Sequence, residues 1–173
     1  GASATSARPQ DSFARLIGAP SEEVTAIRED TSPHGPVTVV LWEPEQSGAE
    51  GENGAPVRRS AVVEAAEMLT DLVLRQVRTL AFVGSRRGSE TIAQIAHRQL
   101  EEVEPGLAHR VAAYRSGYLP EERREIEQQL RDGRLLGLSS TSALELGIDI
   151  AGLDAVLVAG WPGTRSSFFQ QIG

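Results

Sequence analysis

The chain has 173 residues, enough for one ordinary domain, and 40% of them are hydrophobic, so a buried core can form. The net charge of −7 argues against nucleic-acid binding over the whole surface, although a narrow basic groove can lie on an acidic body. The absence of cysteine excludes disulfides and cysteine-bound metal centres. No apolar run reaches the ~18 residues that span a bilayer and no signal peptide is evident, so we expect a cytoplasmic protein that binds no membrane.

The first third of the chain has an irregular pattern. Residues 1–35 predict little beyond a short helix over residues 11–17, and the run TSPHGP at residues 31–36 is typical of a linker that ends in a turn. The β-branched run at residues 37–42 predicts a strand. Residues 46–56 are rich in Gly and Glu and poor in hydrophobic residues, which indicates a mobile loop.

From residue 58 onward, two periodicities alternate. Apolar residues three and four apart predict helices, and short apolar runs predict strands. The predicted helices cover residues 58–75, 88–100, 120–131 and 166–172, and the predicted strands cover residues 79–83, 110–114, 135–139 and 155–159. Strands that alternate with helices through short connections indicate an α/β fold, in which helices cover both faces of a parallel sheet.

Three segments follow directly after predicted strands: residues 84–87, 115–117 and 140–141. In parallel sheets of this kind, ligands bind at the carboxyl ends of the strands. Each segment is rich in Ser, Thr, Gly or Arg, residue types that bind phosphate oxygens without reading bases. Three such loops along one edge of the sheet can contact successive phosphates of a single strand, with binding that weakens as salt rises.

The first loop is the most informative. Ser85, Arg86 and Arg87 stand just ahead of a predicted helix N-terminus, where backbone N–H groups, the helix dipole and guanidinium groups favour an anion. A solvated turn is the plain alternative. A nucleotide P-loop is not indicated, because Ser89 and Glu90 follow the glycine where that motif requires Lys and then Ser or Thr.

The other two loops are weaker signals when taken alone. The run YRSGY at residues 114–118 is equally typical of a surface turn. The hydroxyl run SSTS at residues 139–142 also suits the capping of a following helix, and capping and phosphate binding are compatible. The three histidines, His34, His97 and His109, are scattered and lie beside no carboxylate cluster, so we expect no metal site.

The last third of the chain resembles motifs V and VI of superfamily 2 helicases. The resemblance is carried by LSSTSALELGIDI at residues 138–150, by LDAVLVAGWPG at residues 153–163 and by QQIG at residues 170–173. Residues 79–87 resemble motif IV, and YRSGYLPEERR at residues 114–124 resembles the auxiliary motif that follows it. Ser3-Ala-Thr5 resembles motif III.

Within the superfamily, the combination of motifs is most similar to the RecQ-four-like DNA helicases of bacteria and fungi. Those helicases carry a C-terminal cysteine-rich zinc module, which this cysteine-free chain does not include. The resemblance implies a RecA-like sheet of the P-loop NTPase fold, as the second motor lobe without its own P-loop. It implies that residues 1–35 are the end of the first lobe with a linker. Residues 36–173 would be the helicase C-terminal domain, ending within motif VI ahead of its arginines.

The resemblance also implies roles for individual residues. The residues expected to hold the nucleic-acid backbone are Ser85, Arg86, Arg87, Arg115, Ser116, Gly117, Ser140 and Thr141. Those expected to face ATP are Gly147, Asp149 and Gln170, and those expected to couple ATP to DNA are Ser3 and Thr5. Trp161-Pro-Gly163 is expected to shape the loop into the last helix, with stacking on a base as the alternative.

The implied function is that of an ATP-dependent DNA helicase in its full-length form. ATP and Mg²⁺ are expected as cofactors of the full-length enzyme only, because the 173 residues contain neither a G-x-x-x-x-G-K-[ST] loop nor a metal-binding D-E-x-H or D-E-x-D box. We therefore expect the 173 residues alone to hydrolyse no ATP. The expected partners are single-stranded DNA, a duplex fork and the first RecA-like lobe of the same protein, acting as a monomer.

Three alternatives stay open at the level of sequence. An RNA helicase of the same superfamily would use the same phosphate-binding loops. A non-enzymatic nucleic-acid-binding module with a RecA-like fold would need no ATP site. A Rossmann-type enzyme is disfavoured, because the first predicted strand is followed by Glu43-Pro-Glu45 in place of a G-x-G-x-x-G turn.

Overall fold

The computed structural model describes residues 6–29, 35–114, 117–144 and 152–172, which fall into two compact units, Gly1–Glu43 and Pro44–Gly173. The first unit contains the helix α1 (Pro9–Ile17) and the 3₁₀ turn η1 (Ser21–Glu23). A proline in the first turn opens α1, and Gly18 closes it in the left-handed conformation at φ 70°. The predicted short helix is therefore confirmed. In the described segments, no helix is both long and apolar enough to cross a membrane.

The strand predicted at residues 37–42 is wrong. These residues have no regular secondary structure, and their large apolar side chains are exposed, with Leu41 92% exposed. A β-branched run becomes a strand only when a neighbouring strand supplies partners for its backbone groups. Among the described residues, no strand pairs with it.

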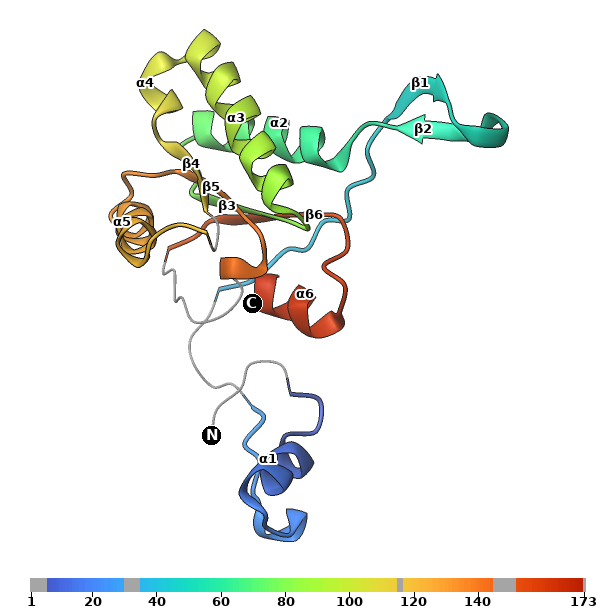
Figure 1. The fold of residues 1–173 in the computed structure, drawn as a ribbon, viewed down its shortest axis with the longest axis vertical. Helices are drawn as coiled ribbons and strands as arrows, with labels where there is room; N and C mark the ends of the chain where they lie inside the picture. The colour runs from blue at the N-terminus through green and yellow to red at the C-terminus, as the bar shows by residue number, and fades with distance from the viewer. Residues whose placement is uncertain (1–5, 30–34, 115–116, 145–151, 173) are drawn as a thin grey trace. The chain divides into compact units, whose positions relative to one another are not determined.

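The loop predicted at residues 46–56 is also wrong. The chain forms an antiparallel hairpin from β1 (Gln46–Glu50), the turn η2 (Glu52–Gly54) and β2 (Pro56–Arg58). Asn53 and Gly54 both adopt positive φ, which is the conformation that Asn-Gly turns favour. All residues of both strands are exposed, and the hairpin stands apart from the sheet of the second unit (Figure 1).

Arg59 anchors the end of this hairpin to the helix α2 (Ala61–Leu74). Its guanidinium lies 2.8 Å from a carboxylate oxygen of Glu64 and 2.6 Å from one of Glu67. The hydrogen bond that Arg59 donates to Glu67 and the charges of both glutamates raise the pKa of Arg59, so the guanidinium stays charged. The hairpin therefore leaves the body of the unit at a fixed point.

The main sheet has four parallel strands in the order β4, β5, β3, β6. These strands are β3 (Thr79–Val83), β4 (Val111–Tyr114), β5 (Gly137–Ser140) and β6 (Ala155–Ala159). Phe82 and Tyr114 are both in register with Ser140, and Val83 is in register with Ala159. The carboxyl ends of all four strands therefore lie side by side along one edge of the sheet.

Helices cover both faces of the sheet, as predicted (Figure 1). On one face α2 and α3 (Arg86–Val103) pack Leu69 and Ile92 over Ala81. On the other face α5 (Pro120–Arg131) packs Leu130 against Leu138. The remaining short elements are α4 (Pro105–Ala108), which the sequence did not predict, η3 (Ser142–Leu144) and α6 (Arg165–Ile172). The fold is an α/β sandwich, in which a four-stranded parallel sheet lies between layers of helices.

Candidate nucleic-acid interface

The N-terminus of α3 begins directly at the carboxyl end of β3. Ser85 is its N-cap, and the Ser85 Oγ accepts a hydrogen bond from the backbone N–H of Gly88 at 3.0 Å. Gly88 is buried, and a Cβ there would lie 2.8 Å from Cγ2 of Val83. The close approach of helix and strand thus depends on glycine at this position. The capping hydroxyl keeps its own proton, which it can donate to an anion.

Arg86 and Arg87 are exposed in the first turn of α3, and this turn contains no acidic residue. The first N–H groups of a helix have no partners within the helix, and the helix dipole places partial positive charge there. Two guanidinium groups beside these N–H groups add bidentate donors that match phosphate geometry. The start of α3 therefore has the chemistry that favours an anion, and phosphate binding there stays a prediction.

The hydroxyl run at the end of β5 divides into structural and exposed members. Ser139 is fully buried, and its hydroxyl donates to the backbone carbonyl of Ser89 at 2.6 Å, which fixes the first turns of α3 over β5. Ser140 is also fully buried, and its hydroxyl donates to the carbonyl of Thr141 at 2.9 Å. The Ser140 side chain is therefore not open to a phosphate, because β5 is a central strand, whereas Thr141 is half-buried and Ser142 is exposed at its end.

The end of β4 is tied to α5 by a buried phenol. Tyr114 is 2% exposed, and its hydroxyl donates to Glu127 Oε1 at 2.8 Å. Burial, followed by this hydrogen bond, raises the pKa of Tyr114 to about 12. Gly117 is exposed, whereas Arg115 and Ser116 lie outside the described residues. Because Tyr114 is in register with Ser140, β4 ends at the same edge as β5.

A cavity of about 320 Å³ opens at this edge, between the ends of β3, β5 and β6. Gly84, Thr141, Ser142 and Trp161 are among the residues that line it. Two of the three loops predicted from the sequence line this cavity. The connection from β6 to α6, which was not among those loops, also lines it. The structure thus brings together Ser85, Arg86, Arg87 and Thr141 within one edge of the sheet.

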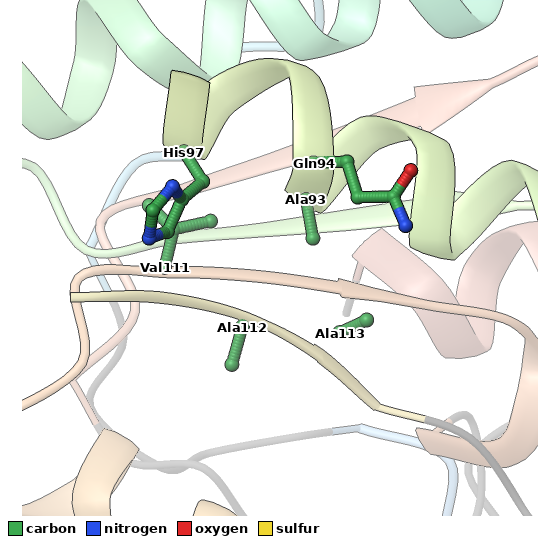
Figure 2. A pocket seen from close by; sticks show the side chains of 6 residues that line it. All are labelled: Ala93, Gln94, His97, Val111, Ala112 and Ala113. Atoms are coloured by element: carbon green, nitrogen blue, oxygen red, sulfur yellow. The ribbon is translucent and has the colours of Figure 1, made fainter. Parts of the chain in front are cut away.

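A second cavity of about 290 Å³ lies between α3 and β4 (Figure 2). Gln94 and His97 of α3 and residues 111–113 of β4 line it, and the Ala112 side chain points away from α3. His97 lies 3.8 Å from Glu101, and the rest of the lining is largely aliphatic. This cavity contains no arginine and no helix N-terminus, so it does not fit a phosphate.

The residues expected to face ATP are mostly outside the described part of the chain. Gly147 and Asp149 fall in the gap between residues 144 and 152, and Ser3 and Thr5 precede residue 6. Gln170 is half-buried on α6. In the described segments, no three His, Asp or Glu side chains gather in a way that could hold a metal ion.

Sequence reasoning missed three residues that shape the interface. Gly88 was visible only as a residue of the loop, and its role depends on the distance to Val83. Ser139 was grouped with the hydroxyls that bind phosphate, but it lies within a central strand that is buried on both faces. The contact between Tyr114 and Glu127 joins residues 13 positions apart, and no local pattern signals it.

Comparison with known proteins supports this description of the fold. The family model described as the helicase conserved C-terminal domain matches residues 64–173. The ATP-dependent helicase HRQ1 of Saccharomyces cerevisiae is 40% identical over 152 residues, which cover 87% of this chain and 14% of the yeast protein. The chain thus spans a small part of the curated relatives that it matches.

Two solved structures are similar over most of the chain. The helicase MrfA, bound to DNA and AMPPNP, is 33% identical with a TM-score of 0.79, over 98% of this chain and 22% of MrfA. The Mycobacterium smegmatis helicase Lhr, bound to single-stranded DNA and AMP-PNP, is 28% identical with a TM-score of 0.60, over 74% of this chain and 16% of Lhr.

Proposed function

This chain belongs to the helicase conserved C-terminal domain family, and we propose that it is the second motor lobe of an ATP-dependent DNA helicase. In this proposal the lobe grips the phosphate backbone of single-stranded DNA with the carboxyl edge of its sheet. It also supplies one face of an ATP site that it shares with the first lobe. Among superfamily 2 helicases we place it with the RecQ-four-like group.

The observation that supports the proposal most strongly is the joint placement of the strand ends. The α3 N-terminus with Ser85, Arg86 and Arg87 lies beside Thr141, because Phe82 of β3 is in register with Ser140 of β5. Neighbouring strands are about 4.8 Å apart, so groups at the ends of adjacent strands can contact one polyanion together. Backbone N–H groups, hydroxyls and guanidiniums bind phosphates of any base sequence, as a translocating motor requires.

The proposed role of ATP concerns the interface with the first lobe. Gly147, Asp149 and Gln170 are the residues that we assign to it, and Ser3 and Thr5 are assigned to the coupling between ATP and DNA. ATP bound between the lobes would favour one arrangement of the two lobes, and its hydrolysis would release that arrangement. The affinity of this lobe for phosphates would then alternate with the state of the nucleotide. MrfA and Lhr were both solved with DNA and an ATP analogue, which is consistent with this proposal.

A salt titration of single-stranded DNA binding tests the phosphate grip. The variant Arg86→Ala/Arg87→Ala is compared with the control Arg75→Ala/Arg98→Ala, which removes the same charge from exposed positions, including one near the other end of α3. If each arginine at the helix start neutralises one phosphate, the slope of log K against log salt flattens by about 1.4 in the first variant and is unchanged in the control. Equal slopes and equal affinities for the two variants would contradict the proposed grip.

A further inference from the structure

One aromatic side chain at the proposed phosphate-binding edge has no role in the grip described above. Trp161 is 65% exposed, although tryptophan buries more apolar surface than any other side chain when it is packed. It follows β6, and Gly160 and Gly163 on either side of Trp161-Pro162 adopt φ values of 87° and 94°. The loop thus presents the indole by a backbone conformation that favours glycine at two positions.

The orientation of the indole is fixed by an aromatic neighbour. The ring of Trp161 stacks on Phe168 of α6, with centroids 5.8 Å apart and an angle of 24° between the planes. Phe168 in turn meets Phe169 edge to face at 5.7 Å. One face of the indole is therefore supported by α6, and its exposure comes from the other face and the edges. A supported ring loses little conformational entropy when a ligand stacks on it.

Trp161 lies at the edge of the sheet where the proposed phosphate contacts lie. Val83 and Ala159 are in register, so the chain leaves β3 at Gly84 and β6 at Gly160 side by side. Trp161 and Gly84 line the same cavity of about 320 Å³, with Thr141 on its other side. An open aromatic face thus lies next to a helix start that carries two exposed arginines, Arg86 and Arg87.

We propose that Trp161 is a stacking platform for one nucleobase of the single strand whose phosphates the α3 N-terminus and Thr141 hold. The α3 N-terminus and Thr141 would contact the phosphates, and Trp161 would contact a base. Proteins that bind single strands without sequence preference combine these two kinds of contact. Every base has a π-face, so the platform selects single-stranded over paired nucleic acid without reading sequence. The inference rests on the proposed function, because it takes the bound strand to be held at this edge.

Tryptophan fluorescence tests this directly, because the chain has only two tryptophans. In a Trp42→Phe background, all tryptophan emission comes from Trp161. The probes are an oligothymidylate and a matched strand of the same length with abasic sites throughout, which keeps the phosphates and removes the bases. We expect oligothymidylate to quench Trp161 and to bind about tenfold more tightly than the abasic strand.

The Trp161→Ala variant, measured by the anisotropy of labelled strands, is expected to bind both strands with the affinity of the abasic strand, and Trp161→Phe to restore part of the difference. If wild-type protein binds both strands equally and without quenching, the stacking platform is ruled out while the phosphate grip stands. If neither strand binds, both proposals fail. A further outcome would overturn the inference: adenosine quenches Trp161, while oligothymidylate and the abasic strand bind with equal affinity. The indole would then bind a free nucleoside and not a base of the strand.

Discussion

At the scale of single residues, the proposed interface depends on a glycine that allows helix and strand to approach closely. Gly88 allows the first turn of α3 to lie against Val83, and it donates the hydrogen bond that Ser85 accepts. The exposed arginines at the helix start are positioned by this contact. A residue with no side chain therefore determines where the charged groups of the interface lie.

A Gly88→Ala substitution tests this dependence. The new Cβ would lie 2.8 Å from Val83 and 3.0 Å from the Ser85 hydroxyl, and the β-branched valine cannot rotate away freely. We expect the free energy of unfolding to fall by about 1–3 kcal/mol, as for other overpacked sites, and single-stranded DNA to bind more weakly. Denaturant unfolding and strand binding measure the two effects.

The control is Gly84→Ala, four residues earlier in the same segment. A Cβ at Gly84 meets no atom within 4 Å, so its effect on unfolding should stay within about 0.5 kcal/mol. Equal stability of Gly88→Ala and Gly84→Ala would show that the close approach of α3 to β3 is not required.

At the scale of elements, the strand ends are held in place by contacts between helices and strands. Ser139 fixes α3 to β5, and Tyr114 fixes β4 to α5. The connection that follows β4 includes Arg115, which the sequence predicts to contact the nucleic-acid backbone. We therefore assign to Tyr114 the positioning of the β4 end relative to the rest of the edge.

Replacing Tyr114 with Phe removes the hydrogen bond to Glu127 and keeps the ring. At neutral pH we expect the free energy of unfolding to fall by about 1.5–3 kcal/mol, the usual range for a hydrogen bond to a charged partner. The folded pKa of about 12 lies above the unfolded value of about 10. The stabilisation by the neutral phenol is thus complete below pH ~10 and is lost as the pH rises through ~12.

The difference in stability between wild type and Tyr114→Phe should therefore shrink between pH 10 and 12. The sequence has no lysine and only one other tyrosine, which both proteins share, so few other groups titrate in this range. Urea unfolding at a series of pH values measures the difference. A difference that stays constant from pH 7 to pH 12 would exclude the phenol of Tyr114 as its cause.

The same scale shows what the sequence could predict. The strands at residues 79–83 and 155–159 and the helix at residues 120–131 were predicted with the bounds observed, because local periodicity and a proline in the first helical turn mark them. The β-branched run at residues 37–42 has the composition of a strand, but no strand in the described chain pairs with it. A local sequence pattern does not indicate whether a partner strand is available. The hairpin at residues 46–58 was missed, because its low hydrophobicity outweighed the Asn-Gly turn signal at residues 53–54.

The common edge of the strand ends could be predicted from the sequence, because topology alone decides it. A parallel α/β sheet brings its strand ends to one edge, so Ser85, Arg86 and Thr141 were correctly placed together from sequence. Burial divided the serine run differently from the prediction, because Ser140 lies on a central strand with helices over both faces. Whether a hydroxyl at the last residue of a strand is inside or outside depends on tertiary packing, which the local sequence does not state.

At the scale of the whole molecule, charge is distributed unevenly. The net charge is −7, yet Arg86 and Arg87 stand at the carboxyl edge of the sheet with no acidic residue in their helical turn. The exposed hairpin carries Glu50 and Glu52 near its tip, where a polyanion would be repelled. This separation of charge favours binding at one edge over binding across the whole surface.

The most direct measurement of the central claim is a map of backbone amides by ¹⁵N NMR during titration with single-stranded oligothymidylate. Chemical shifts should change at the carboxyl edge and stay constant at the amino ends of the same strands. The residues expected to respond are Gly84, Ser85, Arg86, Arg87, Thr141, Gly160 and Trp161, and those expected to stay constant are Thr79, Val111, Gly137 and Ala155. Responses centred on the amino ends, on the β1–β2 hairpin or spread evenly over the chain would contradict the assignment of this edge as the nucleic-acid interface.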